Sequence, residues 1–272
     1  MPMALFEVLC AAIVVAFVLA RSRLAPRSNR LIANYLALAA GAWLSEQSVI
    51  ELYQFYRYTH GWHGFVGVVP LAIALIWPAV IISANDIATA ICKSAAIRTP
   101  LVAALLVFFD AWMIEPIAVR AGLWRWSHPG LFDVPPIGVL GWALFAATAC
   151  WLLHRNRHPL LLAILPPLLL HPALLATWWG ALRWLDRPIA PWLGPACFWP
   201  ISLVATWWLL RQRSHRNVPL STMLLRIPPS ALFFVLLALH RPSMPLVLSA
   251  LAFAPPYLAL TDLAALWRKS HN

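Results

Sequence analysis

Long uninterrupted apolar runs recur along this chain, and they limit its fold more than any other feature. The first is 3-MALFEVLCAAIVVAFVLA-20, and several later runs have a similar length. A helix of about 20 apolar residues crosses a hydrocarbon layer of about 30 Å. Because the runs are continuous and lack the alternation of a barrel strand, they predict an all-α, polytopic transmembrane helical bundle.

Composition supports this fold class and argues against several functions. Hydrophobic residues make up 62% of the chain and charged residues 11%, whereas soluble domains average about 25% charged residues. The net charge of +11 comes from basic residues scattered through short loops, so no nucleic-acid partner is expected. The four cysteines lie in or beside different spans and form no CxxC pair, which indicates neither a disulfide framework nor a zinc site.

The apolar runs predict nine spans in one transmembrane domain that covers residues 1–272. The first run lacks a basic leader and a small-residue cleavage site, so we expect a retained span rather than a signal peptide. The eighth run contains Arg226 and the helix-breaking pair Pro228 and Pro229, so eight spans remain an alternative. The predicted spans lie near 3–20, 31–50, 66–92, 99–119, 136–153, 159–180, 192–210, 219–239 and 244–267.

Arginine and lysine counts predict the orientation of these spans in a cell membrane. The loop after the first span carries Arg21, Arg23, Arg27 and Arg30, and together the odd-numbered loops carry more basic residues than the even-numbered ones. The N-terminus is therefore expected outside. Spans two and four then both end at the outer face, where the two aromatic loops 52–65 and 123–136 follow them.

Four carboxyl groups near this outer face are the main candidates for catalysis: Glu46, Glu51, Asp110 and Glu115. Carboxyls inside a membrane usually face the bundle interior and mark function. A carboxyl that stays protonated in an apolar pocket can act as a general acid. The plainer interpretation is that Asp110 pairs with Arg120 or Arg125 and that Glu115 ends a helix at the interface.

Aromatic side chains near these acids are candidates for substrate binding, because aromatic faces stabilise cations. An ordinary interfacial belt of Trp and Tyr is the alternative. The candidates are Tyr56, Tyr58, Trp62, Trp77, Trp112, Trp124, Trp126 and Trp142.

Motifs for metal or nucleotide chemistry are weak or incomplete. His60 and His63 are a weak metal pair, and His154 and His158 lie in a basic loop. Asp86 lacks the second aspartate of a magnesium-binding prenyltransferase motif. The sequence contains no phosphate-binding or dinucleotide glycine motif. No metal site is therefore predicted.

A series of motifs runs through residues 40–145 in a characteristic order. It begins with Glu51, Tyr56 and Tyr58, and continues through 67-GVVPLAIALIW-77, Asp110, Glu115-Pro116, 122-GLWRW-126 and 134-VPPIGVLGW-142. In these features the chain resembles the integral-membrane carotenoid biosynthesis protein family, which includes hydratases of the bacterioruberin and γ-carotene pathways. The chain has Glu115 where the family usually has aspartate before the proline. This departure leaves open a divergent branch with another terpenoid substrate.

The resemblance implies a membrane enzyme that protonates an isoprenoid double bond to a tertiary carbocation. Water capture would make it a carotenoid hydratase, whereas internal capture would make it a terpene cyclase. Such chemistry needs no cofactor. The implied partners are a lipophilic isoprenoid, the lipid bilayer and other enzymes of the same pathway. A non-catalytic transporter or lipid-binding protein remains the rival class.

Asp110 or Glu51 is expected to donate the proton, and Glu115 or Glu46 to orient water or take a proton back. Asp110 and Glu115 are five residues apart, about 140° around a helix. They therefore cannot share a face unless the helix bends at Pro116. A pair formed by Asp110 and Glu51 across two helices is the sharper prediction, with Tyr58, Trp124 and Trp126 lining the cation pocket.

Overall fold

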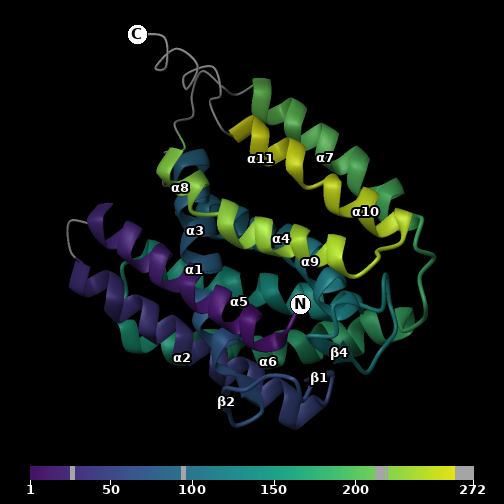
Figure 1. Cartoon of the computed structure of the whole chain (residues 1–272). Helices are drawn as coiled ribbons and strands as arrows, with labels where there is room; N and C mark the ends of the chain where they lie inside the picture. Colours follow the sequence, from purple (N-terminus) through teal and green to yellow (C-terminus); the bar gives the residue numbers. More distant parts are fainter. Residues whose placement is uncertain (25–27, 93–95, 212–217, 219, 261–272) are drawn as a thin grey trace.

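The computed structural model of the chain is a bundle of helices with two small β-ribbons at one end (Figure 1). It describes the whole sequence except residues 25–27, 93–95, 212–217, 219 and 261–272. The helices of the first part are α1 Met3–Leu24, α2 Ser28–Tyr53, α3 Leu71–Cys92, α4 Arg98–Arg120, α5 Pro136–His154 and α6 Pro159–Gly180. The 3₁₀ turn η1 Leu182–Leu185 then leads to α7 Leu193–Arg211, α8 Leu220–Leu224, α9 Ile227–Leu239, α10 Met244–Leu251 and α11 Ala254–Leu260.

Seven helical segments in the described part of the chain are long and apolar enough to cross a membrane, so the chain is an all-α, multi-pass membrane protein. Two of the nine predicted spans are not among the seven. The second corresponds to α2, which carries Arg30, Glu46 and Glu51. The ninth is divided into α10 and α11, and its last residues, 261–267, lie outside the described part.

Two predicted spans are broken or shifted by local backbone chemistry. The eighth divides into α8 and α9 around Arg226, which precedes Ile227 and the prolines 228 and 229. The third begins at Leu71 rather than at residue 66, because β2 (Phe65–Val66) and β3 (Val69–Pro70) form a short hairpin there. Gly67 makes its turn with φ of +63°, a value that glycine adopts without steric cost.

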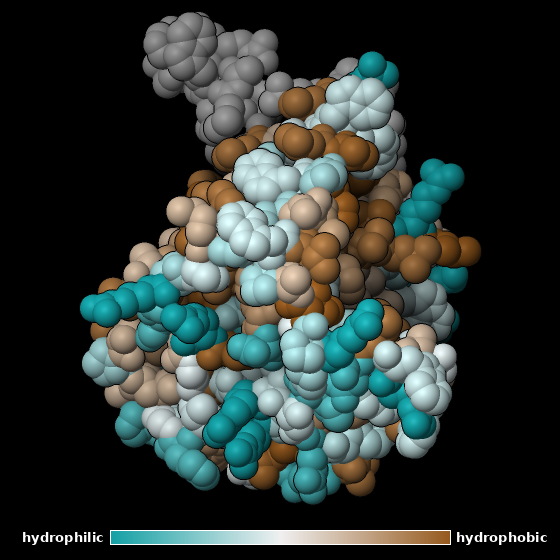
Figure 2. Space-filling view, turned by 90° about the vertical axis from the view of Figure 1, so that its right-hand side faces the viewer, coloured by the Kyte–Doolittle hydropathy of each residue, from teal (hydrophilic) through white to brown (hydrophobic). Residues whose placement is uncertain are grey.

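Helices α2 to α6 pack on one another and enclose the main core. Contacts join α4 with α5, α2 with α6, α5 with α6 and α3 with α4. Helices α7, α10 and α11 form a second group that contacts α4 through α10 (Figure 1). Figure 2 shows hydrophilic side chains mainly on the lower half of one face and hydrophobic side chains on its upper half. Large exposed apolar residues on α1, α6, α7 and α9 fit a surface that contacts lipid.

The aromatic loops after α2 and α4 meet as an antiparallel ribbon. Strand β1 (Tyr56–Tyr58) pairs with β4 (Trp124–Trp126), with Tyr56 opposite Trp126 and Tyr58 opposite Trp124. Side chains alternate along a strand, so these four rings lie on one face and Arg57 is exposed on the other. The predicted convergence of these two segments is confirmed; which side of the membrane they face stays a prediction.

Candidate functional site

A pocket of about 1000 Å³, counted with the open space at its mouth, lies where α2, α3, α4 and α5 meet the β1–β4 ribbon. Small-molecule sites are typically concave and mostly apolar, with a few polar groups. Most of its wall is apolar or aromatic. The lining residues with chemistry to offer are Ser45, Glu46, Tyr56, Tyr58, Trp77, Glu115, Trp124, Trp126 and Trp142.

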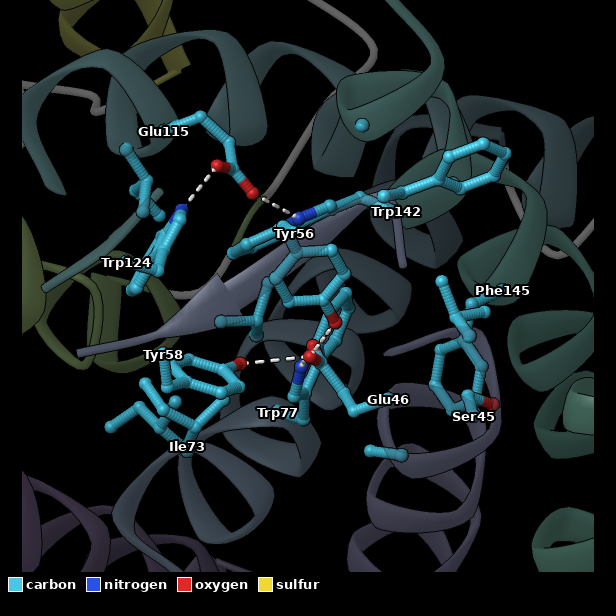
Figure 3. A pocket seen from close by; sticks show the side chains of 18 of the residues that line it. Ser45, Glu46, Tyr56, Tyr58, Ile73, Trp77, Glu115, Trp124, Trp142 and Phe145 are labelled. Carbon is cyan, nitrogen blue, oxygen red and sulfur yellow. Dashed lines mark hydrogen bonds between the residues drawn. The ribbon is translucent and has the colours of Figure 1, made fainter. Parts of the chain in front are cut away.

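Glu46 enters the pocket from α2 and accepts three hydrogen bonds from aromatic side chains (Figure 3). The Tyr56 hydroxyl donates to Oε2, and the Tyr58 hydroxyl donates to the same oxygen at 2.8 Å. The Trp77 indole Nε1 donates to Oε1 at 3.0 Å. The strand register explains this convergence, because alternate residues of β1 point inward.

Glu115 enters the same pocket from α4 and, like Glu46, accepts three hydrogen bonds from aromatic side chains. The indole Nε1 atoms of Trp124 and Trp126 donate to Oε2 at 2.7 and 3.0 Å. The Trp142 indole Nε1 donates to Oε1 at 2.8 Å. The residue is only 2% exposed, so its carboxyl has exchanged water for three fixed donors. A buried polar group without such partners would be costly.

The two sets of donors contact each other ring by ring. Tyr56 contacts Trp126 at 4.7 Å between ring centroids, and Tyr58 contacts Trp124 at 5.9 Å. Trp77 and Trp142 form the third such contact, with 4.3 Å between their ring centroids. Each donor to Glu46 therefore packs against a donor to Glu115. The two carboxyls share one aromatic shell whose parts hold one another in place.

The donors differ in what they can do for the two acids. An indole N–H can only donate a hydrogen bond, whereas a tyrosine hydroxyl can donate and accept. Burial, reinforced by the Glu46 charge, raises the pKa of Tyr56 and of Tyr58 well above the ordinary value. Both phenols therefore keep their protons. The three hydrogen-bond partners of Glu115 can only donate and so favour a carboxylate. The two tyrosine partners of Glu46 can also accept a hydrogen bond from a neutral carboxylic acid.

Most predicted substrate-binding residues line this pocket, but two do not. Tyr56, Tyr58, Trp77, Trp124, Trp126 and Trp142 all contribute to its wall. Trp62 is buried beside it and donates its indole N–H to the Leu123 carbonyl at 2.9 Å. Trp112 lies on another face of α4 and packs against Phe198, with 5.5 Å between ring centroids.

The predicted pair of Asp110 and Glu51 is not formed. Glu51 is exposed at the end of α2 and accepts a hydrogen bond from Gln47 at 2.6 Å. Asp110 points away from Glu115, as the helical geometry required, and binds Arg226 and Tyr257. The partner of Asp110 is thus neither Arg120 nor Arg125. The acids that share the pocket are Glu46 and Glu115.

Several lining residues could not be recognised from sequence patterns. Ser45 precedes Glu46 and lines the pocket, but a lone helical serine carries no functional signal. Leu170, Leu174, Pro229 and Phe233 reach the pocket from α6 and α9, and only the packing of the helices brings them there. In the described part of the chain, no three side chains of His, Cys, Asp or Glu lie close enough to share a metal ion.

Fold and site together define a multi-pass helical membrane protein in which a half-buried and a buried carboxyl, Glu46 and Glu115, face one aromatic pocket. The family model for "Carotenoid biosynthesis protein" matches residues 3–163, more than half of the chain. The chain therefore belongs to this family and has a role in carotenoid biosynthesis. Glu46, Glu115 and all six of their donors lie within the matched residues. Comparison with curated proteins and with solved structures gives no match.

Proposed function

We propose that the protein adds water to a carbon–carbon double bond of a carotenoid or related isoprenoid. The observation that carries the proposal is the pair Glu46 and Glu115 in one apolar pocket, each held by three aromatic donors. Two carboxylates in such a space repel each other, and a proton held by one of them removes the repulsion. The pair thus supplies one acid and one anion.

Glu46 is the proposed acid because its tyrosine partners can accommodate either protonation state. It transfers its proton to the less substituted carbon of the double bond, and the π electrons form the new C–H bond. A tertiary carbocation remains on the neighbouring carbon. The oxygen of a water molecule then forms the C–O bond, and one of its protons returns to the Glu46 carboxylate. The product is a tertiary alcohol and the acid is regenerated.

Glu115 is proposed to stay a carboxylate and to stabilise the cation. Its three indole donors are already in place before the reaction begins, so no reorganisation is needed as the charge develops. The aromatic residues Trp77, Trp142 and Phe145 also line the pocket. Aromatic faces attract cations through the ring quadrupole, so anion and rings act on the same intermediate.

Ser45 supports hydration over cyclisation. Its hydroxyl donates to the Gly41 carbonyl at 2.9 Å, which leaves its oxygen able to accept a hydrogen bond from a water molecule. Ser45 lines the pocket beside Glu46. A water held there would lie close to the acid that protonates the double bond. A pocket that excluded water would instead direct the same cation to an internal double bond.

Product analysis tests the proposal. Cells that make an acyclic carotenoid or a linear prenyl precursor would express either the chain or its Glu46→Gln variant, and lipid extracts would be compared by mass spectrometry. We expect a product heavier by one water with the natural chain alone. A product of unchanged mass but altered retention would indicate a cyclase. No new product, with the protein present in the membrane, would contradict both reactions.

A further inference from the structure

A second cavity adjoins the acid pocket. It encloses about 510 Å³, again counted with the open space at its mouth. Its wall shares five residues with the first pocket: Ile76, Val80, Ile114, Pro229 and Phe233. Ile114 lies on α4 between Asp110 and Glu115, one turn after Asp110. The two cavities are therefore neighbours, and a ligand that occupies both must pass between these side chains.

An ion pair closes the far side of this second cavity. Arg226 donates from Nη2 to Oδ2 of Asp110, and the Tyr257 hydroxyl donates to Oδ1 at 2.6 Å. Arg226 is also 5.1 Å from the Tyr257 ring centroid. Asp110 and Arg226 both line the cavity, and their side chains are 8% and 13% exposed. The charges of this pair are therefore compensated inside the bundle.

One nitrogen atom of the Arg226 guanidinium nevertheless has no hydrogen-bond partner among the described residues. This atom, Nη1, is buried. A buried donor without a partner destabilises the folded protein, and the effect is larger when the group is charged. If the ion pair served only to join α4 to the α8–α9 turn, this second nitrogen would add that cost without benefit. An acceptor atom from a ligand would remove it.

The charge balance of the site indicates which acceptor fits. Asp110 already neutralises the Arg226 guanidinium, so an anionic ligand would bring an uncompensated charge into the bundle. A hydroxyl or carbonyl oxygen brings none and needs one donor. An apolar chain with one neutral oxygen matches both the mostly apolar wall and the one unpaired Nη1 atom.

We propose that Arg226 binds a neutral oxygen of the isoprenoid, remote from the double bond that Glu46 protonates. The inference rests on the proposed function and narrows its substrate class to isoprenoids that already carry a hydroxyl or carbonyl group. A reaction that oxygenates the isoprenoid must then precede this step. Arg226 lies outside the family-matched residues 3–163, so this selectivity belongs to the second half of the chain.

The test compares the binding of two probes by the full chain in detergent. The probes are geranylgeraniol and the hydrocarbon in which its hydroxyl is replaced by hydrogen. Tryptophan fluorescence measures each Kd, because Trp77 and Trp142 line the adjoining pocket. We expect the natural chain to bind the alcohol about tenfold or more tightly, as suits one hydrogen bond from a charged donor.

Arg226→Lys keeps a positive charge for Asp110 but removes the guanidinium fork. It should abolish the preference for the alcohol and leave the Kd of the hydrocarbon unchanged. A second variant, Asp110→Asn with Arg226→Gln, removes both charges together and should do the same without an unpaired buried ion. Arg120→Lys is the matched control, because among the described residues the Arg120 side chain donates to the carbonyls of His240 and Arg241 and does not line the cavity. Thermal unfolding in detergent shows that each variant is folded.

Equal affinity of the natural chain for both probes would overturn the proposal, and so would equal losses for both probes in the two variants. The second outcome would assign Arg226 a purely structural role. Conversion of the probes is followed in the same samples. If the natural chain prefers the alcohol but converts neither probe, the proposed hydration fails while the Arg226 subsite stands.

Discussion

Tyr58 and Trp124 face each other across two paired strands, and each donates to a different acid. The Tyr58 hydroxyl binds Glu46 at 2.8 Å, and the Trp124 indole binds Glu115 at 2.7 Å. Their rings meet edge to face at 5.9 Å between centroids. One cross-strand pair thus links the positions of both carboxyls. A change at either ring is expected to affect both acids.

The two acids should respond differently to neutral replacement. Glu46→Gln removes the proposed proton donor, and we expect kcat to fall about 100- to 10,000-fold. Glu115→Gln removes the anion that faces the cation, and we expect a loss of about 100- to 1000-fold. Glu51→Gln is the control, because Glu51 is exposed outside the pocket, and it should keep normal turnover. Equal activity of all three variants would contradict the assignment.

Alkaline pH should not inactivate the enzyme through Tyr56 or Tyr58. Burial raises the pKa of both phenols, so they keep their protons at pH 10, where an ordinary tyrosine is half ionised. The rate-against-pH profile should therefore show no tyrosine-dependent fall up to about pH 10. The Tyr58→Phe variant should be slower by about tenfold, with an unchanged profile. A fall near pH 10 that disappears in Tyr58→Phe would show an exposed phenol instead.

The indole N–H of Trp142 should matter more than its ring. Trp142→Phe keeps an aromatic face in the pocket but removes the donor to Glu115 Oε1. We expect kcat to fall about tenfold, the loss typical of one hydrogen bond to a charged group. Trp112→Phe is the matched substitution outside the pocket and should change kcat less than twofold, as an order-of-magnitude bound. Similar losses in both would point to packing as the cause.

Gly138 leaves room for Trp126, and a methyl group there should displace the indole. A Cβ at position 138 would lie 2.5 Å from two carbons of the Trp126 ring, well inside contact distance. Gly138→Ala should therefore weaken the bond from Trp126 to Glu115 and lower kcat about tenfold. Gly141→Ala also adds a methyl group beside the pocket, but its nearest neighbour is Leu174 at 3.7 Å. Its activity should be close to normal in the same assay.

Some of this architecture could be predicted from the sequence because the signals are local. Apolar runs give the long helices, and the two aromatic loops lie at the same end of the bundle because their helices run in the same direction. Glu46 and Glu115 were among the four candidate acids. The partners of each acid were harder to predict. Asp110, for example, binds Arg226 and Tyr257, which lie more than 100 residues away in sequence. No periodicity in α4 could indicate partners that come from the α8–α9 turn and from α11.

Exposure was equally hard to predict for Glu46 and Glu51. Both lie near the end of α2, five residues apart. Five residues turn a helix by about 140°, so one side chain enters the pocket and the other faces out. The sequence alone does not tell which, because the direction is set by α3 and α6 packing on the other faces of α2.

Isotope transfer from solvent tests the central claim most directly. The purified chain would convert its isoprenoid in D₂O, and in a separate sample in water labelled with oxygen-18. The product would then be washed in ordinary water, which exchanges hydroxyl deuterium, and its mass would be measured by mass spectrometry. We predict one carbon-bound deuterium in the product of the first sample and one oxygen-18 atom in the product of the second. The Glu46→Gln variant should give neither labelled product. An alcohol formed without a carbon-bound deuterium would contradict proton transfer to the double bond.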